Sequence, residues 1–71
     1  MTTLRLHREL YSLSAIECAR EAFGTLCENH LVTEQTHYVV AVTTRDPGDA
    51  PQLAAELANY ALAATIEERR H

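Results

Sequence analysis

The segment Arg-Asp-Pro-Gly-Asp-Ala-Pro, at positions 45–51, divides this chain more sharply than any other. Pro47 and Gly48 favour a turn, and Asp49 belongs to the residue types preferred just before a helix. Pro51 suits a first helical turn, where its missing N–H would have no partner. We therefore expect β-rich structure to end here and a helix to cover residues 50–69.

The residues before this break show two hydrophobic periods in succession. Residues 2–8 alternate, with Leu4 and Leu6 between polar neighbours, which predicts a half-buried strand. Residues 13–28 change to helical spacing, and we expect a helix there with this apolar stripe facing the core: Ile16, Ala19, Ala22, Phe23 and Leu26. Either Ser12, or Ser14 with Glu17 as a capping box, can begin it.

Two further β-rich segments, residues 30–33 and 37–44, are separated by three polar residues and predict a hairpin. The second segment is apolar on both sides, with Tyr38 and Val40 on one face and Val39 and Ala41 on the other. This is typical of a central strand or of an interface strand.

The order strand, helix, strand, strand, helix predicts one small α+β domain over residues 1–71, built as a two-layer sandwich. Because strand-helix-strand crossovers are right-handed, we expect the first strand to lie beside the last, with both helices on one sheet face. A chain of 71 residues buries only about 60% of its unfolded surface. A partner or a second copy would therefore help to stabilise it.

The charge excludes two classes of partner. The formal net charge is −4, and the six basic residues form no patch that could neutralise nucleic-acid phosphates or anionic lipid.

The N-terminal residues lack the apolar core of a signal peptide, and the sequence has no run of about 20 apolar residues that could span a membrane. We expect a cytoplasmic protein.

The helix over 50–69 is more apolar than one buried face requires. At 100° per residue, the face assigned to the sheet contains Leu53, Leu57, Tyr60, Ala61 and Ala64. A second stripe of Ala55, Ala58, Leu62 and Ile66 falls on roughly the opposite side. One interpretation is that alanine simply favours helix and that isolated exposed apolar residues are ordinary. The other is that this stripe packs on another protein or on a second copy of the chain.

The residue types that support metal binding or catalysis do not occur in the usual spacings. No Cys-x-x-Cys or His-x-x-x-His pair is present, and His30 and His37, which could face each other across the hairpin, are too few for a zinc site. Cys18 and Cys27 would lie about 13 Å apart along one helix, beyond disulfide reach, so we interpret them as free thiols. We expect His71, at the chain end, to be mobile.

We therefore predict no catalytic residue, no cofactor and no metal, and hence no enzyme. The sequence also has no glycine-rich phosphate loop. A metal- or thiol-dependent protein that uses His30, His37 and a cysteine is a rival hypothesis.

An open three-stranded sheet also offers the unpaired backbone groups of its edge to an extended peptide.

The whole pattern resembles one family. A strand followed by "LYSLSAIECAREAF", then "YVVAVTT", a Pro/Gly-containing acidic loop and "LAAELANYALAATIEER" is similar to the HxsD-like proteins, small accessory proteins of the His-Xaa-Ser radical-SAM peptide-modification systems. The most specific pieces are Tyr11-Ser12-Leu13 and Glu56-Leu57-x-Asn59 with Leu62. The chain departs from the family pattern at Ala63, where an acid is usual.

The resemblance implies a non-catalytic adaptor in the maturation of a ribosomal peptide, which binds a radical-SAM modifying enzyme, its precursor peptide, or both. The predicted partner-binding residues are Ala55, Ala58, Asn59, Leu62 and Ile66. The alternative is a homodimeric assembly module with no role in peptide binding, which would use Leu62 and Ile66 symmetrically.

Overall fold

The computed structural model describes residues 1–70, so the expectation for His71 lies outside the described residues. Their elements are β1 (Thr2–His7), α1 (Leu13–Ala22), β2 (Glu28–Thr33), β3 (His37–Thr43), a short 3-10 helix η1 (Pro47–Asp49) and α2 (Ala50–Arg69). This order confirms the predicted α+β fold. No helix in the described part of the chain is long and apolar enough to cross a membrane.

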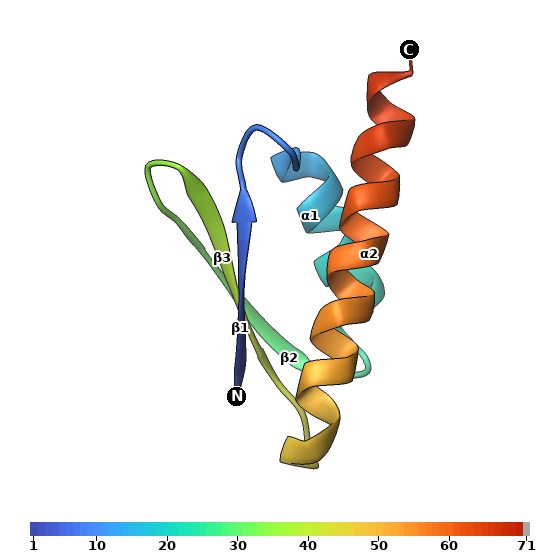
Figure 1. The fold of residues 1–71 in the computed structure, drawn as a ribbon. Helices are drawn as coiled ribbons and strands as arrows, with labels where there is room; N and C mark the ends of the chain where they lie inside the picture. The colour runs from blue at the N-terminus through green and yellow to red at the C-terminus, as the bar shows by residue number, and fades with distance from the viewer. Residues whose placement is uncertain (71) are drawn as a thin grey trace.

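The three strands form one antiparallel sheet in the order β1-β3-β2. Val40 of β3 lies opposite Leu4 of β1 and opposite Leu31 of β2. Figure 1 shows α1 and α2 on the same side of the sheet. The predictions that the first strand lies beside the last, and that both helices cover one face, are therefore confirmed. β3 is thus the central strand, one of the two positions that its apolar pattern allowed; Val39 and Ala41, on the face without helices, are only half-buried.

The core lies between the sheet and the two helices. Its largest fully buried side chains are Ile16 from α1, Leu57 from α2, and Val40 and Val42 from β3. The buried line of α2 is otherwise made mostly of alanine, namely Ala50, Ala54 and Ala61. Short side chains allow the long helix to approach the sheet and α1 closely, which a small two-layer domain needs in order to fill its interior.

The first helix is shorter than predicted. It ends at Ala22 rather than at residue 28, and Phe23 occupies the C-cap position. The N–H groups of Leu26 and Cys27 both donate to the Phe23 carbonyl oxygen, at 3.0 and 3.1 Å, so the chain turns here. The predictions that Ala22 and Leu26 face the core are wrong, because both residues are exposed, Leu26 to 58%. Pairing with β3 begins already at Glu28, and that pairing competes with further helix.

The helix starts differ from the simplest sequence rules. Ser12 is the N-cap of α1 and its hydroxyl accepts from the Ala15 N–H at 3.1 Å, so the Ser14–Glu17 capping box does not form. Asp49 occupies the N-cap position of α2 but makes no capping hydrogen bond with its side chain. Asp46 instead caps η1 by accepting from the Gly48 N–H at 3.0 Å.

The buried face of α2 is rotated relative to the prediction. Its buried residues are Ala50, Ala54, Leu57, Ala61 and Thr65, so Leu57 and Ala61 were assigned correctly. Leu53 and Ala64 are only half-buried. Tyr60 is 46% exposed and contacts the edge of the Phe23 ring, with 6.0 Å between centroids. The rotation arises because α2 must pack against α1 as well as against the sheet.

Candidate functional site

The outer edge of β1 has backbone groups without partners. The Arg8 N–H donates to the Thr36 carbonyl oxygen at 3.0 Å, which identifies this pair as hydrogen-bonded. Hydrogen-bonded and non-bonded pairs alternate along an antiparallel ladder, so Leu6 and Leu4 also bond to β3. The N–H and C=O groups of Thr3 and Arg5 must then point away from the sheet.

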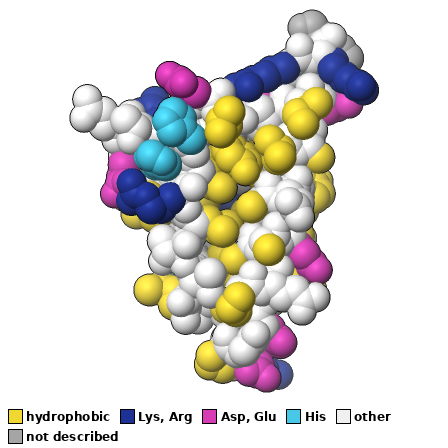
Figure 2. Space-filling model, in the orientation of Figure 1, with side chains coloured by type: hydrophobic (Ala, Val, Ile, Leu, Met, Phe, Trp, Pro, Cys, Tyr) yellow, Lys and Arg dark blue, Asp and Glu magenta, His cyan; other side chains and the backbone are white. Residues whose placement is uncertain are grey.

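The apolar stripe of α2 lies next to this edge. Arg69, on the same flank of the helix, donates to the Glu9 carbonyl oxygen just beyond β1 at 2.8 Å. Tyr60, on the opposite flank, contacts Phe23 of α1 instead. Figure 2 shows hydrophobic side chains gathered between β1 and α2 on the face toward the viewer. The stripe and the free edge therefore form one continuous surface.

The structure places the predicted partner-binding residues on or beside this surface. Leu62 is 38% exposed and Ile66 is 52% exposed. Ala55 and Asn59 are exposed, and Ala58 is half-buried against the core. The surplus apolar surface inferred from the sequence therefore exists in the folded chain.

The outer edge of β2 is free in the same way. The Glu34 N–H donates to the His37 carbonyl oxygen at 2.8 Å, and alternation from this pair assigns Val32, His30 and Glu28 to bonds with β3. The backbone groups of Asn29, Leu31 and Thr33 consequently point outward. The side chains of these three residues lie on the helix side of the sheet, where Leu31 packs half-buried against the core.

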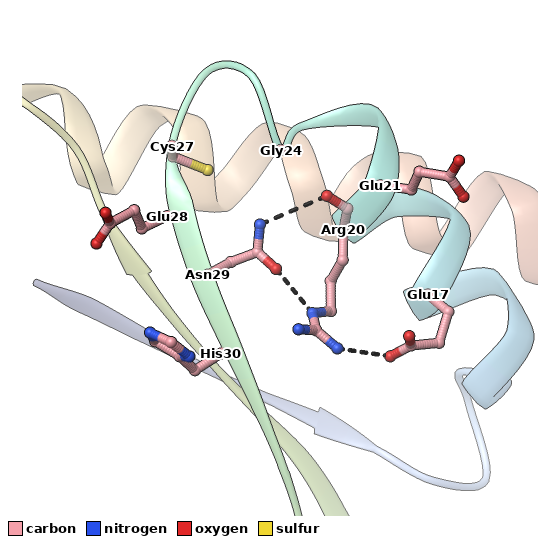
Figure 3. A pocket seen from close by; sticks show the side chains of 8 residues that line it. All are labelled: Glu17, Arg20, Glu21, Gly24, Cys27, Glu28, Asn29 and His30. Atoms are coloured by element: carbon pink, nitrogen blue, oxygen red, sulfur yellow. Dashed lines mark hydrogen bonds and ion pairs between the residues drawn. The ribbon is translucent and has the colours of Figure 1, made fainter.

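A pocket of about 590 Å³ opens between this second edge and α1 (Figure 3). It is lined by Glu17, Arg20, Glu21, Gly24, Cys27, Glu28, Asn29 and His30. In Figure 3, Asn29 points from β2 toward α1, whereas Glu28 and His30 point away from the helix. The pocket thus joins the helix side and the outer face of the sheet around the free edge of β2.

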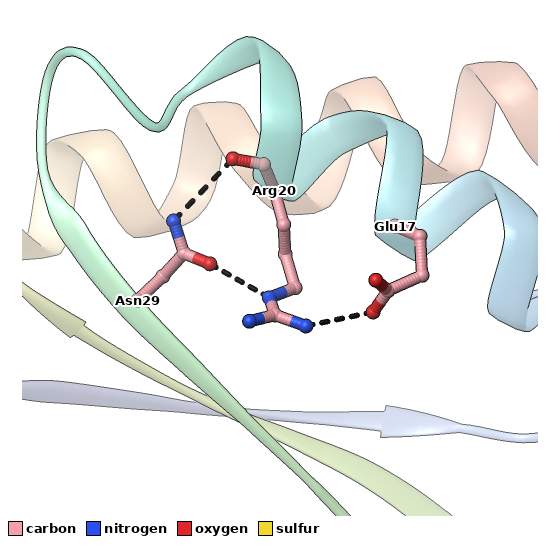
Figure 4. Close-up of polar contacts among 3 residues, drawn as sticks. All are labelled: Glu17, Arg20 and Asn29. Atoms are coloured by element: carbon pink, nitrogen blue, oxygen red, sulfur yellow. Dashed lines mark hydrogen bonds and ion pairs between the residues drawn. The ribbon is translucent and has the colours of Figure 1, made fainter.

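Arg20 is held across this pocket by three polar contacts (Figure 4). Its Nε donates to Oδ1 of Asn29 at 2.7 Å, and Nδ2 of Asn29 donates back to the Arg20 carbonyl oxygen at 3.4 Å. Its Nη1 lies 2.7 Å from a carboxylate oxygen of Glu17. Nothing in the sequence pairs Arg20 with Asn29, because they belong to different elements, so the sequence analysis missed this site.

The lining of the pocket is acidic. Its three carboxylates belong to Glu17, Glu21 and Glu28, whereas Arg20 is its one guanidinium. Glu17 is already paired with Arg20, and among residues 1–70 neither Glu21 nor Glu28 has an ion-pair partner. The electrostatic environment therefore favours a cationic group over an anionic one.

The histidines do not form the arrangement considered for them. The hairpin register places His30 opposite Ala41, so the prediction that it could face His37 is wrong. The register of β1 with β3 places His37 opposite His7 instead. The His7 and His37 rings meet edge to face with 4.9 Å between centroids. Residues 1–70 contain no group of three or more His, Cys, Asp or Glu side chains placed to hold a metal ion.

Both cysteines are free, as predicted, although they do not share one helix. Cys18 is exposed on α1, and Cys27 is half-buried just before β2. The Cys27 thiol donates to the Phe23 carbonyl oxygen at 3.5 Å. In Figure 3 the His30 ring lies away from the Cys27 sulfur.

A polar cluster joins the start of α1 to the end of α2. The Glu68 carboxylate accepts from the hydroxyls of Ser12 and Ser14, the latter at 2.6 Å. These two bonds, Ser12 first, stabilise the charged form and lower the pKa of Glu68. The Ser12 N–H also donates to Oγ1 of Thr65 at 3.1 Å. This cluster links the start of α1 to the end of α2.

Comparison with protein-family models, with curated proteins and with solved structures gave no match.

Proposed function

We propose that this chain is a non-catalytic, cytoplasmic accessory protein of ribosomal peptide maturation that binds an extended segment of a precursor peptide along β2. The sequence resemblance to the HxsD-like proteins supplies the biological setting. In that setting the radical-SAM enzyme performs the chemistry, and this chain presents or positions the peptide.

The observation that carries the proposal is the free edge of β2 beside the acidic pocket. Main-chain groups of Asn29, Leu31 and Thr33 point outward from this edge. An added strand pairs with such groups through its own backbone and contributes alternate side chains to the two faces of the sheet. A peptide bound in this way gains affinity from the backbone and selectivity from the pocket.

The pocket gives the peptide a preferred composition. Side chains of the added strand that point to the helix side pass Glu21, and those that point to the outer face pass Glu28. A lysine or arginine on either face therefore meets a carboxylate without a partner among the described residues. We expect a peptide that carries at least one basic residue at the Asn29 end of β2.

The test uses a phage-displayed library of random ten-residue peptides, with purified full-length protein as bait. Selected peptides should be enriched in lysine and arginine. Titration followed by amide NMR should shift the signals of Asn29, Leu31 and Thr33. Selection of no peptide, or shifts confined to other surfaces, would contradict the proposal.

A proline variant gives the matched control. Thr33→Pro removes an outward N–H that takes no part in the ladder with β3, so the sheet should tolerate it. It should weaken peptide binding by about tenfold or more, the equivalent of one lost backbone hydrogen bond of about 1.4 kcal/mol. Thr3→Pro makes the same change at the other edge and should leave peptide affinity unchanged.

The biological setting has a separate test. The genes that flank the coding gene should include one for a radical-SAM enzyme and one for a short precursor peptide. The purified precursor should then compete with the selected library peptides. If it does not compete, the maturation role fails even where peptide binding by β2 holds.

A further inference from the structure

The other free edge, together with the apolar stripe of α2, points to a second copy of this chain as its occupant. We infer a two-fold dimer in which β1 pairs antiparallel with β1 of the second copy, centred on Leu4, while the two α2 helices pack against each other above that pair. This inference goes beyond the proposed function and uses a different surface.

The first argument is the position of the free backbone groups. Thr3 and Arg5 present their N–H and C=O groups outward, and they flank Leu4 symmetrically. In an antiparallel pair centred on Leu4, Thr3 lies opposite Arg5 of the second copy. Each such pair exchanges both of its hydrogen bonds. The next outward carbonyl, that of His7, already accepts from the N–H groups of Leu10 and Tyr11. The β1 backbone groups without a partner are therefore those on either side of Leu4.

The second argument is charge. Like charges directly opposite each other destabilise a strand pair, and this register places each Arg5 opposite a threonine instead. The Arg5 guanidinium is also neutralised within its own chain, because Nη1 lies 3.1 Å from the Glu34 carboxylate. On the helix side the two Leu4 side chains meet. The edge thus pairs with itself without bringing two charges together.

The third argument is the level of α2 above β1. Leu4 and Ala58 are both half-buried, and both pack against the same core cluster. That cluster contains Val40, which lies opposite Leu4, and Leu57, the neighbour of Ala58. The two-fold axis through Leu4 therefore passes near Ala58, in the middle of the apolar stripe.

The stripe is also complementary to itself about Ala58. Its C-terminal half contains the large residues Leu62 and Ile66, and its N-terminal half contains the small residue Ala55. In an antiparallel pair of helices, Leu62 of one copy packs against Ala55 of the other. Large side chains placed against small ones fill the space between helices without voids.

A stable dimer of a chain this small requires a substantial share of its exposed surface. The described residues expose 4684 Å². A stable interface buries about 800 Å² on each partner, roughly a sixth of that area. The paired sheets would form one six-stranded sheet with a β2 edge at each end. Peptide binding and dimerisation would therefore not compete.

The test is sedimentation equilibrium of the full chain from about 1 μM to about 1 mM, which spans ordinary dimer affinities. We expect a dimer mass for the wild type and for Thr33→Pro. Leu62→Asp and Thr3→Pro should raise the dimer dissociation constant at least about a hundredfold. A wild type that is monomeric throughout, or a Thr3→Pro variant that dimerises normally, would overturn the inference.

Disulfide cross-linking tests the same dimer geometry without substitutions that could unfold the protein. In a Cys18→Ser, Cys27→Ser background, Ala58→Cys near the axis should form a disulfide-linked dimer on mild oxidation. Ala63→Cys, exposed on the opposite side of α2, should not. Equal cross-linking of the two, with normal circular dichroism, would contradict the geometry. The peptide titration remains a separate measurement, so the failure of either proposal can be told from the failure of the other.

Discussion

The hydroxyl of Thr65, fully buried on α2, accepts a hydrogen bond from the backbone N–H of Ser12 at the start of α1, with 3.1 Å between nitrogen and oxygen. The same hydroxyl donates to the Ala61 carbonyl oxygen at 2.8 Å. A threonine at the C-terminal end of an otherwise apolar buried line thus satisfies a helix-start N–H that would otherwise be left without a partner.

Replacement of Thr65 by valine should therefore destabilise the protein more than its similar shape suggests. The Ser12 N–H would lose its acceptor, which costs about 1–3 kcal/mol for a buried group. Thr65→Ser keeps the hydroxyl and should recover most of that loss. Urea unfolding followed by circular dichroism measures both variants. Equal stability of Thr65→Val and wild type would show that the bond contributes little.

Glu68 should make stability depend on pH in the acid range. Its pKa is lowered in the folded state, so its contribution is complete above the ordinary glutamate pKa of about 4.3 and is lost as the pH falls through the lower folded value. Glu68→Gln should therefore be less stable than wild type at neutral pH, and the difference should shrink on acidification. Glu56→Gln, on the exposed side of α2 and outside the cluster with Ser12 and Ser14, is the matched control.

Substitution of Leu57 and of Leu26 by alanine should have very different effects on the free energy of unfolding. The sequence analysis placed both in the core, correctly for Leu57 and wrongly for Leu26. Leu57 is fully buried, and Leu57→Ala should cost about 2–5 kcal/mol because it leaves a cavity. Leu26 was predicted to be buried but is exposed, so Leu26→Ala should change stability by no more than about 0.5 kcal/mol. Similar losses for the two substitutions in thermal unfolding would refute the placement of Leu26.

The two thiols should react at different rates. Cys18 is exposed on α1, whereas Cys27 is half-buried and its thiol donates to the Phe23 carbonyl oxygen. A maleimide reagent should label Cys18 first, and Cys18→Ser should remove the fast phase. Mass spectrometry after short exposure identifies the labelled residue. Faster labelling of Cys27 would mean that its surroundings open readily.

The sequence predicted the elements and their arrangement in the sheet, but not where α1 ends or which face of α2 is buried. The alternation of Leu4 and Leu6, the turn at Pro47-Gly48 and the helical spacing after it identified the fold correctly. The end of α1 was missed because the pairing of Glu28 with β3, a long-range contact, decides where helix gives way to strand. The rotation of α2 was missed for a related reason, since its buried face depends on where α1 lies.

Of the candidate sites, one could be predicted from the sequence, whereas the others depend on contacts between distant parts of the chain. The stripe with Leu62 and Ile66 could be found because helical periodicity exposes it directly. The pocket with Arg20 and Asn29 could not, because two side chains nine positions apart meet only after the chain has turned back. The free edges required the strand register together with single hydrogen bonds at Arg8 and Glu34, which show the residues of each edge strand whose backbone groups face outward.

The placement of β3 at the centre of the sheet has a consequence for the order of folding. β2 and β3 form a local hairpin, whereas β1 joins β3 only after about 30 intervening residues have been closed into a loop. We therefore expect the hairpin to gain hydrogen-exchange protection first in pulse-labelled refolding, and β1 last. Until β1 arrives, β3 can accept the β1 of a neighbouring chain, so refolding at high protein concentration should yield strand-exchanged dimers that dilution separates only slowly.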